Sequence, residues 1–74
     1  MMTAAKEATH LKVTVNFTRV KGGRTLNLNR VYFFELSECA SAGKATRMAH
    51  DELKDEFGSD FQSIENITTK VERW

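Results

Sequence analysis

The chain has 74 residues, a hydrophobic share of 41%, a charged share of 28% and a formal net charge of +1. This length predicts one small domain with a thin core, and the near-neutral charge argues against a general polyanion binder. The charge is uneven, because residues 1–50 carry eight Lys/Arg and three Glu, whereas residues 51–74 carry three Lys/Arg and seven Asp/Glu.

Two strands joined by a glycine turn are predicted for the first half of the chain. Residues 1–10 are predicted to form a flexible tail before a single domain over 11–74. From Leu11 onward, apolar and polar residues alternate, which is the period of a half-buried strand. Gly22-Gly23 is a favoured two-residue hairpin turn. With this turn the numbers of facing residues sum to 45, so Phe17 faces Leu28 and apolar pairs meet along most of the hairpin.

A helix and a third strand are predicted for the second half. Ser41 is the expected N-cap and Gly58 the expected C-terminal cap. Between them, apolar residues recur at the helical spacing of three and four, namely Ala45, Met48, Ala49, Leu53 and Phe57. A last strand is expected over Glu65–Arg73. The predicted fold is therefore α+β, in the order β-β-α-β, with a three-stranded antiparallel sheet of order 2-1-3 and the helix on one face.

The other face of this sheet is a candidate binding surface. One helix can cover only one face, and the residues left outside include several asparagines, which are unusual in strands. Amides hydrogen-bond widely and an exposed aromatic ring can anchor a partner or stack on a base. The residues that we assign to possible nucleic-acid binding on this face are Lys12, Asn16, Asn27, Asn29 and Phe33. A plain solvent-exposed face is an equally open interpretation.

Charged groups are the second candidate. Lys21 directly opposite Arg24 is a like-charge pair that costs stability, and Arg19 and Arg30 add to the positive charge that we expect at the hairpin tip. The helix carries cations early and anions late, which opposes its macrodipole. The residues assigned to partner binding are Arg19, Lys21, Arg24, Arg30, Lys44, Arg47, Asp51, Asp55 and Glu56. The alternative is that solvent screens all of these charges.

Catalytic and metal-binding patterns are not found in the sequence. Cys39, His10 and His50 lack metal-ligand spacing, and the carboxylates of 51–60 do not form an isolated pair in different environments. We therefore expect a protein that is not an enzyme and that uses no cofactor and no metal. Because Cys39 is the only cysteine, and neither a signal peptide nor a membrane span is recognisable, we expect a cytoplasmic protein without a membrane partner.

The stretch from Tyr32 to Ala49 runs from a strand into the pattern A-S-x-x-x-A-x-x-x-A. With the preceding hairpin and the following strand, residues 11–73 resemble small phage and prophage proteins, among them anti-CRISPR proteins built from a bent antiparallel sheet and one helix. This resemblance implies stoichiometric inhibition of a large host complex, in the host cytoplasm if the protein is phage-encoded. Nucleic-acid mimics are usually strongly acidic, so at a net charge of +1 only the acidic residues of 51–60 fit mimicry.

Three functions stay open from the sequence. The first is a non-catalytic interaction protein that binds and inhibits a host protein or ribonucleoprotein complex, for example a CRISPR effector, through charged patches. The second is a small nucleic-acid-binding protein that uses the open sheet face and the basic tip. The third is a structural homodimer without a ligand, paired through an edge strand, so that both a monomer and a homodimer are possible. The role of Trp74 is left open.

Overall fold

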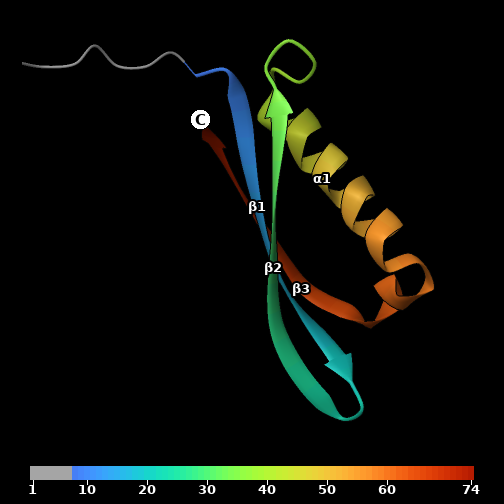
Figure 1. The fold of residues 1–74 in the computed structure, drawn as a ribbon. Coiled ribbons are helices and arrows are strands. Elements are labelled where there is room, and N and C mark those ends of the chain that lie inside the picture. The colour runs from blue at the N-terminus through green and yellow to red at the C-terminus, as the bar shows by residue number, and fades with distance from the viewer. Residues whose placement is uncertain (1–7) are drawn as a thin grey trace, which may run out of the picture.

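The computed structural model describes residues 8–74, which form a three-stranded antiparallel sheet with one helix on a single face (Figure 1). In chain order the elements are strand β1 (His10–Lys21), strand β2 (Arg24–Glu35), helix α1 (Ala42–Phe57), a 3₁₀ helix (Gly58–Ser63) and strand β3 (Ile64–Arg73). The strand order is β2-β1-β3, so the predicted α+β fold and its β-β-α-β order are confirmed.

The hairpin has the predicted register. Residues of β1 and β2 pair without interruption from His10 opposite Glu35 to Lys21 opposite Arg24, and Phe17 faces Leu28 as expected. Gly22 and Gly23 have φ angles of 59° and 76°, a conformation that would be strained for a residue with a side chain. Two consecutive positive φ angles match the twist of the flanking strands, so the glycine pair fixes the register of the hairpin.

The N-terminal boundary differs from the prediction, because β1 begins at His10. The N–H of Thr9 donates to the carbonyl oxygen of Trp74 at 3.1 Å, and the carbonyl oxygen of Thr9 accepts from Leu36 at 3.0 Å. His10 therefore belongs to β1 instead of the predicted tail, and backbone hydrogen bonds tie Thr9 to Trp74 and Leu36. Ala8 lies outside any helix or strand. The rest of the tail prediction concerns residues 1–7, which lie outside the described residues.

Both predicted helix caps are present. The hydroxyl of Ser41 accepts a hydrogen bond from the backbone N–H of Lys44 at 3.1 Å. At the other end Gly58 has a φ of 56° and donates its N–H to the carbonyl of Lys54. These two caps satisfy backbone groups that the helix itself leaves unpaired, and they fix where α1 begins and ends over the sheet.

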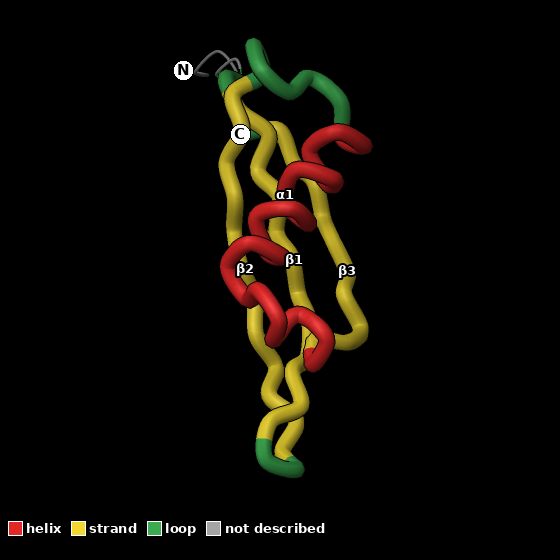
Figure 2. Tube along the Cα trace, turned by 90° about the vertical axis from the view of Figure 1, so that its right-hand side faces the viewer, coloured by secondary structure: helices red, strands yellow, loops and turns green. Residues whose placement is uncertain are grey.

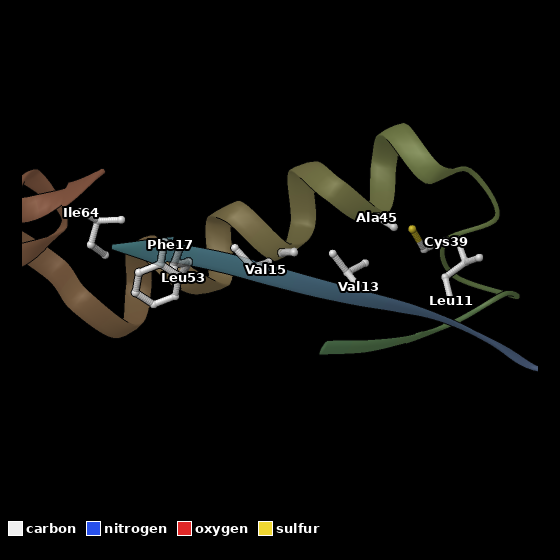
Figure 3. Packing of buried hydrophobic residues seen from close by; sticks show 9 residues of the cluster. Leu11, Val13, Val15, Phe17, Cys39, Ala45, Leu53 and Ile64 are labelled. Carbon is white, nitrogen blue, oxygen red and sulfur yellow. The ribbon is translucent and has the colours of Figure 1, made fainter. Parts of the chain in front are cut away.

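The core lies between β1 and α1 (Figure 3). Its buried residues come mostly from the central strand and from one face of the helix: Leu11, Val13, Val15, Phe17, Cys39, Ala45, Ala49, Leu53 and Ile64. Ala45 and Ala49 are fully buried and small, which allows the helix to lie close to the sheet. The sheet surface facing away from α1 has no second layer within the described part of the chain (Figure 2).

The third strand pairs with β1 and carries one bulge. Asn16 lies opposite Thr68 whereas Thr18 lies opposite Glu65, so β3 holds one extra residue at this point. Asn66 has a φ of 55°, the left-handed conformation that asparagine tolerates better than most residues. The pairing of β3 ends with Ile64 opposite Arg19. The hairpin beyond Arg19 therefore projects past both β3 and the end of the helix (Figure 2).

Candidate functional site

The hairpin tip carries fewer of the predicted basic residues than expected from the sequence. Lys21 and Arg24 are exposed and directly opposite each other, as predicted. Arg19 instead forms an ion pair with Asp60 of the 3₁₀ helix, with 3.1 Å between its Nη2 and the carboxylate, and its side chain is only 20% exposed. The tip itself thus presents the two charges of Lys21 and Arg24.

Arg30 lies beneath the C-terminal end of the helix and not at the tip. Its Nε and Nη2 donate to the Glu56 carboxylate at 2.7–3.0 Å, and its guanidinium lies 5.5 Å from the ring centre of Phe57. These hydrogen bonds lower the pKa of Glu56 and raise the pKa of Arg30, because each charge stabilises the other. The pair links β2 to α1, and both charges are already neutralised within the molecule.

The remaining charged candidates lie along α1. The ammonium group of Lys44 donates to the carbonyl oxygen of Glu38 at 3.1 Å, close to the start of the helix. Arg47, Asp51 and Asp55 are exposed and follow one another at intervals of four residues, which places them in one row on the solvent side. This row lies close neither to the hairpin tip nor to the open face of the sheet.

An aromatic patch occupies one end of the uncovered sheet face; we use this name for Lys12, Val31, Phe33 and Trp74. Val31, Phe33 and Trp74 are 45%, 51% and 59% exposed. The ring centres of Phe33 and Trp74 are 6.1 Å apart, and the ammonium of Lys12 lies 4.1 Å from the centre of the Trp74 ring. Large exposed apolar side chains that contact one another are typical of a binding surface.

Trp74 belongs to this patch although its role stayed open from the sequence. Its N–H donates to the carbonyl of His10 at 3.0 Å, and the N–H of His10 donates back to its carbonyl at 3.2 Å. This pairing extends the sheet by one residue beyond β3 and puts Trp74 on the same face as Lys12. The alternation of Glu72 and Trp74 along the last strand was the signal for this placement, but it needed the register with β1.

A hollow lined by amides lies further along the same face. It has a volume of about 320 Å³, and its lining residues are Asn16, Phe17, Thr18, Asn27, Leu28, Asn29 and Asn66. Asn16 faces Asn29 across the hairpin, as predicted. The bulge in β3 adds Asn66, whose amide nitrogen donates to the Thr18 hydroxyl at 3.1 Å. The hollow therefore offers hydrogen-bond donors and acceptors without charge, and we call it the amide hollow.

Comparison of the chain with protein-family models, with curated proteins and with solved structures finds no match. Across residues 8–74, no helix combines the length and the apolar character that crossing a bilayer requires. The same residues contain no group of three or more His, Cys, Asp or Glu side chains placed to hold a metal ion. The open face of the sheet, which carries the aromatic patch and the amide hollow, is the candidate binding site.

Proposed function

We propose that this chain is a non-catalytic interaction protein that binds a host macromolecular complex and inhibits it by occupying a surface of that complex. The observation that carries the proposal is the aromatic patch, where three large apolar side chains are 45–59% exposed on a sheet face that no other element of residues 8–74 covers. Aromatic anchors of this kind supply much of the binding energy in protein interfaces. Inhibition of a host complex, such as a CRISPR effector, is the form of this function that the resemblance to small phage proteins implies.

The distribution of charge supports the aromatic patch over the charged patches as the centre of the interface. Arg19, Arg30 and Glu56 are engaged in ion pairs between elements of the same chain. Breaking these pairs to contact a partner would leave charged groups to be paired again, at a cost in affinity. Lys21 and Arg24 stay exposed at the hairpin tip, away from the aromatic patch, where charges affect the rate and selectivity of association more than its strength.

The test is capture of a partner from a bacterial lysate, with mass spectrometry of the bound proteins. We expect the double variant Phe33→Ala/Trp74→Ala to capture about tenfold less partner, or less still, since aromatic anchors dominate the binding energy. The matched control is Val20→Ala/Leu26→Ala, which removes two side chains that are 42% exposed at the tip. Equal capture by both double variants and the wild type would refute the patch as the interface.

Charge reversal at the tip separates the patch from the basic finger. If Lys21→Glu/Arg24→Glu abolished capture while Phe33→Ala/Trp74→Ala left it unchanged, the tip would be the binding surface. We expect instead a modest loss of captured partner that becomes smaller as salt is added, because charges away from the interface act mainly through long-range attraction.

A second candidate function is binding of single-stranded nucleic acid on the same face, favoured by the amide hollow beside the aromatic patch. Bases stack on exposed aromatic rings, amides hydrogen-bond to base edges, and Lys12 and Lys70 on the same face offer contacts for phosphate. Trp74 is the only tryptophan in the chain, so its fluorescence reports stacking directly. Quenching by a short oligonucleotide that weakens steeply with salt would support this function. Unchanged fluorescence at low salt would exclude it.

A further inference from the structure

The two edges of the sheet differ in how open they are to another strand. A strand at a sheet edge presents unpaired N–H and C=O groups, and proteins usually blunt such edges with bulges, charges or proline. The outer strands β2 and β3 form the two edges, because β1 lies between them. The hydrogen-bond pattern determines which backbone groups face outward on each edge.

The pairing of His10 with Trp74 shows which residues of β1 hydrogen-bond to which neighbouring strand. His10 and Trp74 exchange both of their main-chain hydrogen bonds, at 3.2 and 3.0 Å. Because bonding alternates along an antiparallel strand, even-numbered residues of β1 bond to β3 and odd-numbered residues bond to β2. The bonded partners in β2 are then its even-numbered residues, since facing residue numbers sum to 45. The outward backbone groups of β2 belong to Thr25, Asn27, Asn29, Val31, Phe33 and Glu35. Among them, the Glu35 carbonyl already accepts from the N–H groups of Glu38 and Cys39, and the Asn29 carbonyl accepts from the Arg30 guanidinium at 2.8 Å.

These outward residues of β2 are also the residues of the open face. Val31 and Phe33 thus combine exposed apolar side chains with free backbone hydrogen-bonding groups. The pairing of β2 with β1 runs through twelve residues without a bulge, and the chain contains no proline. Charges on β2 are confined to Arg24 and Glu35 at its ends and to Arg30, which is paired with Glu56.

The edge formed by β3 is protected by comparison. Its register is broken by the bulge at Asn66, whose positive φ bends the strand. Charged residues then follow along the ten-residue strand, namely Glu65, Lys70, Glu72 and Arg73. An incoming strand would have to accommodate both the bend and these charges, so β2 is the more accessible edge of the sheet that residues 8–74 form.

We propose that a second copy of this chain pairs with β2 in antiparallel orientation, so that two sheets join into one of six strands. A two-fold axis at Val31 pairs residues 27–35 of one chain with residues 35–27 of the other. Asn29 then faces the partner's Phe33, Arg30 faces the partner's Tyr32, and no like charges face each other. A longer overlap with the axis at Arg30 would set two guanidinium groups opposite each other, which is unfavourable.

The pairing also brings the apolar side chains together. The two Val31 side chains meet at the axis, and each Phe33 lies two residues away from it on the same face. The two aromatic patches would then lie on one continuous surface. This proposal stands apart from the proposed function, since a monomer can still bind a partner through one patch.

The test is the mass of the full chain in solution by sedimentation equilibrium, over concentrations from about 1 to about 500 micromolar. We expect a concentration-dependent dimer. In Asn29→Pro the hairpin keeps its hydrogen bonds, because the Asn29 N–H faces the free edge, and a strand can carry proline at such a position. The dissociation constant of the dimer should rise by about tenfold or more, since a backbone donor is lost and the proline ring obstructs the incoming strand.

Thr69→Pro is the matched control, because Thr69 is exposed on β3 and its N–H faces the other edge by the same alternation. It should leave the dimer intact. A wild-type monomer at every concentration would overturn the proposal, as would a dimer that Thr69→Pro dissociates and Asn29→Pro does not.

A second variant tests the register without depending on proline. In Val31→Cys the Cα atoms of the two cysteines that meet at the axis would be about 5.5 Å apart, within the range that a disulfide spans. Mild oxidation should give a covalent dimer, and native Cys39 should not interfere because it is buried. Val20→Cys places an equally accessible thiol at the tip and should stay monomeric under the same oxidation. Equal crosslinking of both variants would contradict the register.

Discussion

At the scale of single residues, Arg30 shows how a charge can be part of the fold instead of a binding surface. The alternation of the first hairpin places it opposite Val15, and hence on the side that faces the helix. Its guanidinium contacts the ring of Phe57 and donates to Glu56 in a two-pronged arrangement. An arginine stem can cover apolar rings while its charged end stays hydrated, so this residue both packs and pairs.

We expect Glu56→Gln to lower the free energy of unfolding by about 0.2–1 kcal/mol at neutral pH, which is the range for a solvent-exposed ion pair. The measurement is urea denaturation followed by circular dichroism. Glu52→Gln is the control, since it removes a carboxylate one turn earlier that forms no ion pair in residues 8–74. An equal loss in both variants would mean that the Arg30 pair contributes nothing specific.

The same pair predicts a dependence on pH. Hydrogen bonds from Arg30 lower the pKa of Glu56 below its ordinary value of 4.5, so the unfolded chain binds this proton more tightly than the folded one. The stabilisation is complete at neutral pH, and it is lost as the pH falls from about 4.5 through the folded-state pKa. Across this window, wild-type stability should fall more steeply than that of Glu56→Gln. Parallel curves would argue against the pair.

At the scale of secondary-structure elements, the contact between α1 and β1 depends on two alanines. Ala45 and Ala49 are fully buried, and Leu53 continues the same face one turn later. Small residues bring the helix backbone close to the strand, which leaves no space for longer side chains. This close approach also places the C-terminal end of α1 where Glu56 reaches Arg30.

Ala49→Leu should therefore destabilise the protein by about 1–3 kcal/mol through overpacking. Arg47→Leu adds the same side chain on the solvent side of α1 and should change stability by about 0.5 kcal/mol or less. The midpoint of thermal unfolding for each variant measures the difference. If the two variants unfolded at the same temperature, the helix would not lie as close to β1 as the structure has it.

At the scale of the whole molecule, the protein is long and thin. Its extents are 54 × 27 × 15 Å, and its radius of gyration of 15.0 Å exceeds the value of about 11 Å expected for a compact domain of this size. The cause is a sheet of long strands with a helix layer on one face only. Such a molecule has a small core for its surface, and its central strand holds both edges together.

Hydrogen exchange should reflect this arrangement. Amides in the middle of β1, such as those of Val13 and Thr14, bond to β2 and β3 respectively, so they should exchange only on global unfolding. In dilute solution, where the proposed dimer dissociates, the outward-facing amides of Asn29 and Val31 should exchange much faster than the amides of β2 that are bonded to β1. Slow exchange of these two amides at the lowest concentration would contradict an open β2 edge.

The sequence by itself determined the hairpin, its register, both helix caps and the order of the sheet. Strand period, the glycine pair and the capping residues are local signals, and the two strands of the hairpin are joined directly, so counting from Gly22-Gly23 is enough to pair them. The opposition of Asn16 and Asn29 and that of Lys21 and Arg24 come from the same count.

Only the tertiary structure decided which residues from distant parts of the chain meet. Trp74 joins Phe33 and Asn66 joins the amide hollow because the third strand takes a register that no turn dictates. Arg30 pairs with Glu56 because α1 lies close over β1. That register depends on the bulge at Asn66 and on how closely α1 lies over β1. Such contacts are set by packing of the whole chain, since the long helical connection leaves the third strand free to shift along its neighbour until side chains fix it.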